Sequence, residues 1–570
     1  MQKGAQRLTV VSAVSRGQIG GLATAEGPAL FEVSDGDLAE LRDDVVACRR
    51  TRALNWVQHR ANLLRSVSPA DPNTPALLGY LVQWADAGGN LAEQLAELEA
   101  RFPAADRGRL PLYSYLFLRF AGGVLNFLRG EPDSGDLDFV ITVASSGCAS
   151  RDLLLFAHLW KADIDRQRGA LDRAKWHAGQ SREIAIQSGY PVLSAKSQAL
   201  EGLVKLDGSI PDALELLRQA ESSMLASEDW LWLGRIQNGL GLAALDEGRY
   251  QSALDHFTSA RDWFARAEKP HTELGWSHFQ IARAQRLLAS RLAKNIDATA
   301  ELHRRSQRAG TRAAPPSNTQ SRRRLEEIRS AAFSELSQAE NVFRSVNEAG
   351  RRDAVVLERG ALWTDCGELQ QAAQHAQESF CAGRRQQDAL LMAQARLLQS
   401  RIEKTLCEEG VGLDLTDHAQ RACEYVKEAQ ALALECTAKP SVKRRLLAAI
   451  YVCEGLILLN EFFNKPEAAR ECCHSAAEYV NPSERDELWD EYQSLVSRAL
   501  HSASIDAKLR KWSEGLAEGK TFQQITEEFA DLVIPAVWAR EGKNTSRVVA
   551  KLSISPKKVR RILNRAGLKD

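Results

Sequence analysis

The chain has 570 residues, of which 44% are apolar and 26% are charged, shares that are typical of a soluble, folded protein. This length excludes a single hydrophobic core, since such cores rarely grow beyond roughly 250–300 residues, and it predicts several domains or one long array of repeats. The 74 basic and 74 acidic residues balance, so any preference for a charged partner must come from a local excess of charge.

The composition predicts an all-α protein in a reducing compartment. Ala, Leu, Arg, Glu and Gln dominate, whereas Val, Ile and Pro are sparse, a bias that favours helices. The ten cysteines are scattered without the spacing of zinc ligands, so we expect reduced thiols in a cytosol. The apolar run at the N-terminus is too short for a signal peptide, and the most apolar helix, residues 445–459, is interrupted by Glu454. We therefore expect a cytoplasmic protein without a membrane partner.

Residues 1–70 give the weakest pattern of the chain. A stretch rich in glycine, which could form a loop or a short strand, precedes a helical stretch that begins near Asp37. We expect this region to cap the array that follows.

The next region, residues 71–302, contains an internal repeat. Small and aromatic residues follow the spacing G-x6-G-x-Y-x2-A-x3-F-x2-A at Gly241, Gly248, Tyr250, Ala253, Phe257 and Ala260. Small residues let two helices approach closely, a glycine ends the first helix, and aromatic side chains fill the groove between neighbouring pairs. The pattern resembles the tetratricopeptide repeat (TPR), a pair of antiparallel helices. This resemblance implies an α-solenoid, in which each pair packs against its neighbours.

The same turn recurs along the chain. It is found at Gly169, Gly208 and Gly367, each followed at the same spacing by an apolar residue and an alanine: Leu171 and Ala174, Ile210 and Ala213, Leu369 and Ala372. The glycines at 130, 169, 208 and 248 are 39, 39 and 40 residues apart, and the interval of 119 residues from 248 to 367 predicts three more units. Further pairs are expected around Gly410 and in Asn464–Ala476, so the repeats extend over residues 325–500.

The segment 303–324 does not fit the repeat pattern. It contains seven arginines and no acidic residue, with proline, serine and glycine at its centre. Such a composition cannot form a packed core, so we predict a disordered loop inside the array. The loop either is simply solvated or forms a second basic arm that contacts nucleic acid.

Residues 501–570 end in a strongly basic stretch. From Arg540 to Asp570 there are ten lysines or arginines and two acidic residues, a local charge of +8 in a neutral chain. Asn544 or Thr545 is placed to cap one helix, while Ser555 and Pro556 are typical of the start of another, which Gly567 would end. The second helix has an apolar stripe opposite its basic residues: Val559, Ile562, Leu563 and Ala566.

These residues are similar to the helix-turn-helix of the Fis family, over roughly residues 522–568. The resemblance implies that the helix from Pro556 enters the major groove of DNA, where Arg and Lys read guanine and Asn reads adenine. The DNA-binding residues it implies are Asn544, Thr545, Arg547, Lys551, Ser555, Lys557, Lys558, Arg560, Arg561, Asn564 and Arg565. It also implies a homodimer built on the preceding long helix through Phe522, Ile525, Phe529, Leu532, Val533 and Val537. The chain departs from the family at Lys543, where a glycine is common, and at Pro535, which can kink the dimer helix or end it early.

No sequence motif of an enzyme is found. The chain lacks a phosphate-binding loop, a nucleophile elbow, a zinc-protease motif and a kinase signature. We expect no cofactor, and we interpret His158 and His177 as packing or surface residues rather than ligands. Trp230 and Trp232 either belong to the core or line a peptide groove.

Two functional hypotheses follow from the sequence. The first is a transcriptional regulator that binds DNA through its tail, and so is nucleoid-associated when bound, while the TPR surface receives a protein, peptide or small-molecule signal. The second is an interaction scaffold of a larger defence or stress assembly, whose basic tail holds nucleic acid without sequence preference. The third possibility is that the tail only caps the solenoid. A sequence-specific regulator prefers its own site by roughly 10³ or more, whereas non-specific binding shows only a salt dependence.

Overall fold

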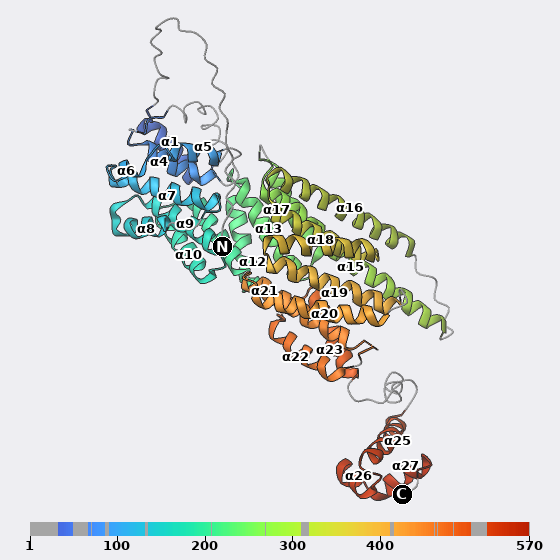
Figure 1. Cartoon of the computed structure of the whole chain (residues 1–570). Coiled ribbons are helices and arrows are strands. Elements are labelled where there is room, and N and C mark those ends of the chain that lie inside the picture. The colour runs from blue at the N-terminus through green and yellow to red at the C-terminus, as the bar shows by residue number, and fades with distance from the viewer. Residues whose placement is uncertain are drawn as a thin grey trace, which may run out of the picture. The chain divides into compact units, whose positions relative to one another are not determined.

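A computed structural model describes most of the chain. The described residues are 32–49, 67–69, 71–85, 91–131, 135–206, 208–267, 270–308, 318–410, 415–460, 462–463, 465–482, 484–502 and 521–568. Within these ranges every regular element is a helix and no strand is formed (Figure 1), which confirms the predicted all-α fold. None of the described helices is long and apolar enough to cross a membrane.

The first of two compact units comprises residues 1–86 and 90–153. Its helices are α1 (Asp35–Val46), α4 (Thr74–Leu81), η1 (Val82–Trp84), α5 (Leu91–Glu99), α6 (Ala104–Arg107), α7 (Leu112–Leu128), α8 (Asp136–Val143) and η2 (Ala144–Cys148). Helix α7 packs against α4, α5 and α8, and α1 packs against α4. The large side chains of Tyr80, Trp84, Phe117 and Phe120 fill the core between them. Most of the predicted cap, residues 1–70, lies outside the described residues.

The second unit begins within helix α9 (Arg151–Gln167) and forms an α-solenoid. Its following helices are α10 (Leu171–Gln187), α11 (Pro191–Lys205), α12 (Ile210–Met224), α13 (Trp230–Asp246), α14 (Tyr250–Phe264), α15 (Thr272–Arg308), α16 (Asn318–Ser345), α17 (Ala349–Asp365), α18 (Leu369–Gln386), α19 (Ala389–Glu409), α20 (Leu415–Glu435), α21 (Pro440–Leu458), α22 (Pro466–Tyr479) and α23 (Glu487–Ser502). From α10 to α23 each helix packs against the next. This succession of hairpins confirms the TPR-like solenoid.

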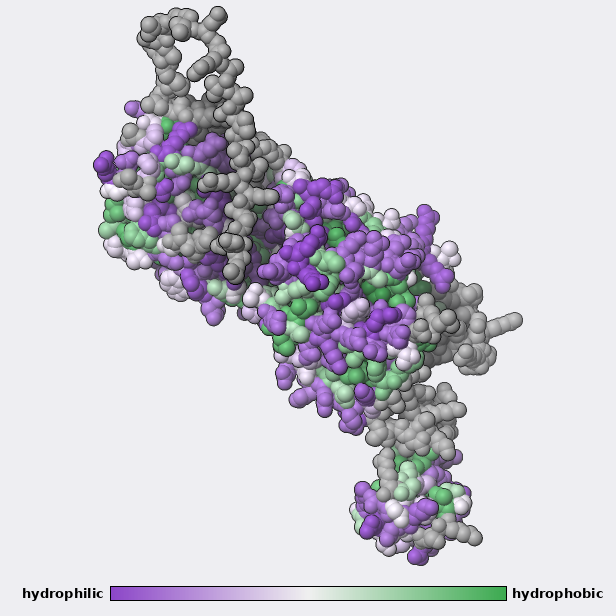
Figure 2. Space-filling view, viewed as in Figure 1, coloured by the Kyte–Doolittle hydropathy of each residue, from purple (hydrophilic) through white to green (hydrophobic). Residues whose placement is uncertain are grey.

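The residues of the repeat pattern explain the close packing of the α13–α14 hairpin. A β-carbon on Gly241 would come within 2.5 Å of the Phe257 ring, so only glycine leaves room for the aromatic side chain. Ala253, Phe257 and Ala260 are fully buried. Gly248 ends the first helix with φ +70°, a conformation that glycine adopts without strain. On the face drawn in Figure 2, hydrophilic residues cover much of the repeats, since the apolar faces are buried between neighbouring helices.

Two predictions about the array are corrected. Three repeat units between Gly248 and Gly367 would place two further helical hairpins between these glycines. The structure has one, formed by α15 and α16. The prediction of three more units was wrong because α15 has 37 residues and α16 has 28, so one long hairpin fills the distance. Both helices also extend into the segment 303–324, since α15 ends at Arg308 and α16 begins at Asn318. The centre of the predicted loop, residues 309–317, lies outside the described residues.

The odd-numbered helices form the inner row of the solenoid. Contacts between alternate helices join α11 to α13, α15 to α17, α17 to α19, α19 to α21 and α21 to α23. Among the described residues the even-numbered helices have no alternate contacts of this extent, so the odd-numbered helices are the more closely spaced row.

The end of the chain folds into a three-helix domain. Helices α25 (Phe522–Arg540), α26 (Thr545–Leu552) and α27 (Pro556–Arg565) all contact one another. Their shared core contains Ala530, Ile534, Trp538, Val548, Val559, Ile562 and Leu563.

Candidate nucleic-acid interface

The start of each short helix is fixed by the predicted cap. The side-chain oxygen of Asn544 accepts the backbone N–H of Arg547 at 3.1 Å, and the hydroxyl of Ser555 accepts the N–H of Lys558 at 3.3 Å. Pro556 lies in the first turn of α27, where its missing N–H costs no hydrogen bond. Gly567 follows the helix with φ +72°. Helices α26 and α27 thus begin at the expected caps, whereas Ala566, which was predicted to lie in the apolar stripe, is exposed.

Helix α25 supplies the part of the core that the sequence analysis missed. Ala530, Ile534 and Trp538 are buried against α26 and α27. Their spacing of four residues is the helical periodicity that could have identified them. The helix continues past Pro535 to Arg540, so the proline does not end it early.

The residues predicted to form a dimer interface differ in how deeply they are buried. Val537 packs against the core of its own three-helix domain. Ile525, Leu532 and Val533 are half-buried, and Phe529 keeps 45% of its surface exposed. The side chain of Phe522 lies outside the described residues. Dimerisation through these residues stays a prediction.

Three of the predicted DNA-binding cations form ion pairs within the domain. Arg561 and Arg565 reach across from α27 to Glu527, and Arg565 also pairs with Asp531 at 3.0 Å. Lys551 pairs with Glu541. The hydrogen bond from Arg561 lowers the pKa of Glu527, and the hydrogen bond from Lys551 lowers that of Glu541. One side of α27 is therefore turned toward carboxylates of α25.

The remaining predicted DNA-binding cations have no ion-pair partner among the described residues. Lys557 and Arg560 are exposed on α27, and in the part of the chain that the structure describes no carboxylate forms an ion pair with either. Arg547 on α26 is exposed and Lys558 on the flank of α27 is half-buried, and neither pairs with a carboxylate of the described residues. Asn564 is exposed on the same side of α27 as Lys557. The exposed residues of α27, Lys557, Arg560 and Asn564, form what we call the open basic face.

Two predicted residues contribute to the local fold. Thr545, at the start of α26, is mostly buried, with 9% of its surface exposed. The hydroxyl of Ser555 is used by the cap of α27.

Two histidines and two tryptophans of the solenoid were considered as candidate site residues. His158 and His177 are both buried, and their Nδ1 atoms lie 2.9 Å apart. Burial, together with the neighbouring His177, lowers the pKa of His158 to about 4, so this imidazole stays neutral. Trp230 and Trp232 belong to hydrophobic core clusters, which agrees with their interpretation as core residues. Among the described residues no group of three or more His, Cys, Asp or Glu is arranged to hold a metal ion.

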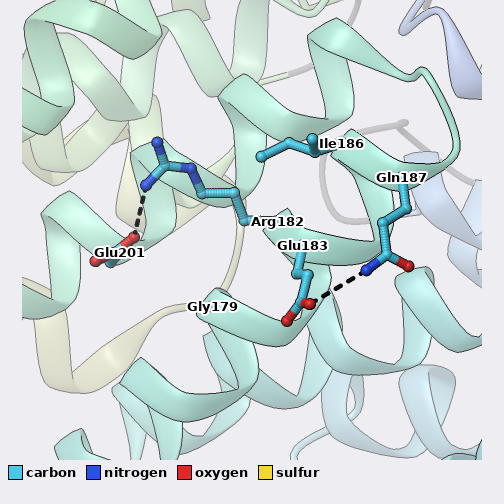
Figure 3. Close-up of a pocket in the computed structure, with 6 residues that line it drawn as sticks. All are labelled: Gly179, Arg182, Glu183, Ile186, Gln187 and Glu201. Carbon is cyan, nitrogen blue, oxygen red and sulfur yellow. Dashed lines mark hydrogen bonds and ion pairs between the residues drawn. The ribbon is translucent and has the colours of Figure 1, made fainter.

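One surface cavity lies between α10 and α11. Figure 3 shows its lining residues: Gly179, Arg182, Glu183, Ile186, Gln187 and Glu201. Arg182 pairs with Glu201 at 3.3 Å, and Gln187 donates to Glu183 at 3.1 Å. Because these polar side chains already bond to one another, the cavity does not define a ligand.

Comparison with known proteins gives distant structural likenesses alone. No family model and no curated protein matches the chain. Among solved structures, a Rap protein complexed with Competence and Sporulation Factor is 12% identical, with a TM-score of 0.45 over 75% of this chain and 99% of that chain. Aspartyl phosphate phosphatase F from Bacillus subtilis is 11% identical, with a TM-score of 0.39 over 81% of this chain and 98% of that chain. The quorum sensor NprR from B. thuringiensis is 10% identical, with a TM-score of 0.26 over 82% of this chain and 98% of that chain.

Proposed function

We propose that the protein is a DNA-binding transcriptional regulator whose solenoid receives a protein, peptide or small-molecule signal. The observation that carries the proposal is the open basic face. An exposed row of Lys557, Arg560 and Asn564 lies on α27, and the opposite side of that helix is buried in the domain core. An amphipathic helix of this kind can enter the major groove with its cations forward and its apolar side supported.

The electrostatic setting of these residues supports the proposal. A lysine or arginine that already pairs with a carboxylate must give up that contact to bind phosphate or a base. Lys557 and Arg560 have no such contact among the described residues, so their charge is available to a polyanion. The similarity of residues 522–568 to the Fis family points to the same ligand.

The scaffold hypothesis has one observation in its favour. Arg561 and Arg565, which were predicted to read bases, are engaged by Glu527 and Asp531. If these pairs persist on DNA, fewer side chains remain to distinguish one base from another. Binding would then follow charge more than sequence.

Selection of genomic fragments by the purified protein tests the proposal. A regulator should enrich a common motif and prefer it over scrambled DNA by roughly 10³ or more. Fragments recovered without a common motif, and bound with the same salt dependence as scrambled DNA, would support the scaffold instead. No retention of DNA at low salt would reject both.

A further inference from the structure

An acidic segment of the chain, Glu484–Glu491, lies along the inner row of the solenoid. It consists of the end of the loop after α22 and the first turn of α23. The backbone N–H of Arg485 donates to the carbonyl oxygen of Asp246 at 3.0 Å. The carbonyl oxygen of Arg485 lies so close to Gly248 that a β-carbon there would come within 2.2 Å of it. The segment is therefore seated directly against the turn between α13 and α14.

The end of this segment within α23 pairs with α15 and α19. Glu487 accepts hydrogen bonds from Lys294 at 3.0 Å and from Ser290 at 2.9 Å. Glu491 accepts one from Arg401 at 2.9 Å. Burial alone would raise the pKa of Glu487, but Arg286 and Lys294 lower it to about 2. This carboxylate is thus held firmly in its charged form.

The other end of the segment pairs with α21. Arg445 donates to Glu484 at 2.8 Å and also contacts Asp486. Its guanidinium reaches Asp246 at 3.1 Å as well, so one side chain joins α13, α21 and the segment. Arg444 forms a further ion pair with Glu484. Every helix named in these contacts belongs to the odd-numbered inner row.

One arginine in the same row has no direct partner. The face of α15 that contacts the segment carries polar residues at i, i+3, i+7 and i+11: Arg283, Arg286, Ser290 and Lys294. Arg286 pairs with Glu358 at 2.6 Å and with Asp365 at 3.0 Å. For Arg283, by contrast, none of the described residues provides a hydrogen bond or an ion pair, and burial lowers its pKa. Glu358 and Asp246 favour its charged form from a distance, but neither contacts it directly as Glu358 contacts Arg286.

The charges of the inner row itself are unbalanced. Apart from the segment, the groups near one another include seven basic side chains and three carboxylates: Arg283, Arg286, Arg291, Lys294, Arg401, Arg444 and Arg445, with Asp246, Glu358 and Asp365. The segment supplies the missing negative charge. These cations are partly to mostly exposed, and their combined charge favours an acidic occupant over a neutral or basic one.

We propose that the inner row is a binding surface for an acidic peptide segment of a partner, and that Glu484–Glu491 is a built-in competitor for it. A carboxylate of the incoming peptide pairs with Arg283, and further carboxylates replace Glu484, Asp486 and Glu487 on their cations. Displacement frees the start of α23, the last solenoid helix before the three-helix domain in the chain. The inference deepens the proposed function, on which it rests, by assigning the surface and the chemistry of the signal.

The test uses the full chain, without DNA, and a fluorescent synthetic peptide with the sequence of residues 484–493 in which Ala replaces Arg485. In the wild type the tethered segment competes at an effective concentration on the order of millimolar, so the probe binds weakly. The double variant Asp486→Lys/Glu487→Lys removes the competitor, and we expect the probe to bind at least about tenfold more tightly to it. Adding Arg283→Ala to that double variant should reverse part of the gain.

A second measurement needs no variant. In the wild type, excess acidic probe should accelerate tryptic cleavage after Arg485, whereas a probe with its acidic residues changed to Gln should not. The proposal would be overturned if the wild type and a folded double variant bound the probe equally weakly. It would also be overturned if the acidic probe did not change the rate of cleavage after Arg485. Because neither measurement includes DNA, their failure leaves the proposed DNA binding standing. Conversely, a protein that binds the probe but selects no DNA refutes the regulator alone.

Discussion

The inner row of the solenoid and the open basic face use the same residue types in opposite electrostatic settings. In the solenoid, Arg286, Arg401 and Arg445 are partly buried, and each pairs with at least one carboxylate. On α27, Lys557 and Arg560 are exposed, and no carboxylate of the described residues pairs with them. A buried cation without a partner destabilises the fold, whereas an exposed one is solvated by water. The solenoid arginines therefore need a carboxylate partner, from the chain itself or from a ligand, whereas the open ones are available to a ligand without losing a contact within the protein.

The largest expected effect is that of Arg445→Ala. Its removal leaves Asp246, Glu484 and Asp486 without their shared partner, so we expect unfolding free energy to fall by about 3 kcal/mol, the lower end of the range for breaking a buried pair. The control is Arg470→Ala, since Arg470 makes an exposed pair with Glu467 that is worth roughly 0.5 kcal/mol or less. Denaturant unfolding of both variants provides the measurement. Equal stabilities would contradict the division between buried and exposed pairs.

Acid titration sharpens the same comparison. The pKa of Glu487 is lowered to about 2, so its contribution to stability is present above the ordinary value near 4.5 and is lost as the pH falls below it. Burial raises the pKa of Asp246 to about 6, so its ionised form costs stability at neutral pH and this cost fades below that value. Glu487→Gln should therefore be less stable than the wild type at pH 7, and this difference in stability should become smaller toward pH 3.

Asp246→Asn should behave in the opposite sense. At pH 7 it should be at least as stable as the wild type, and any advantage should vanish as the pH falls from about 6 toward the ordinary aspartate range. Thermal unfolding midpoints at pH 7, 5 and 3 measure both variants. If the unfolding midpoints of the two variants changed with pH in the same way, the pKa values of Glu487 and Asp246 would not be shifted in opposite directions.

The local features of both regions could be predicted from the sequence, because their causes lie within one or two helical turns. The caps at Asn544 and Ser555 and the turns at Gly248 and Gly367 are of this kind. Long-range pairs could not be predicted, since Asp246 and Arg445 are 199 residues apart. The pairing of Arg561 was missed for the same reason. Helical periodicity shows that this side chain avoids the apolar stripe, but not that α25 brings Glu527 beside it.

On the open basic face, Lys557→Ala and Arg560→Ala should each weaken binding to a selected DNA site by about 1–3 kcal/mol if they contact base edges. Arg561→Ala should have a smaller effect, because Arg561 pairs with Glu527 within the domain. Lys551→Ala should lower affinity for all sequences alike and reduce the salt slope by about one. Fluorescence anisotropy at two salt concentrations, with selected and scrambled DNA, separates these outcomes. A larger loss for Arg561→Ala than for Lys557→Ala would show that the ion pair opens on DNA.

Gly248 and Gly367 allow a matched test of whether the acidic segment packs against the turn between α13 and α14. Gly248 and Gly367 have φ values of +70° and +82°, so alanine at either position costs roughly 1 kcal/mol in backbone strain. Near Gly367 a β-carbon meets nothing within 4 Å, whereas at Gly248 it meets the carbonyl oxygen of Arg485. Gly248→Ala should therefore lose more stability than Gly367→Ala and should also increase tryptic cleavage after Arg485. Similar behaviour of the two variants would show that the segment is not held against this turn.

The smallest expected effect is that of Lys543→Gly. Lys543 has φ +60° in the turn before α26, a left-handed conformation that costs a residue with a β-carbon roughly 1 kcal/mol. Its ammonium group lies 6.0 Å from the centre of the Trp538 ring, a contact worth about 0.5 kcal/mol that glycine would lose. The net result should be a gain of about 0.5 kcal/mol in the local stability of the three-helix domain.

Hydrogen exchange of the α26 and α27 amides in the full chain measures this gain without unfolding the solenoid. Lys543→Asn is the control, because asparagine tolerates the left-handed region while it also removes the charge. Slower exchange in both variants would identify backbone strain as the cause, whereas faster exchange in both would show that the contact with Trp538 outweighs that strain.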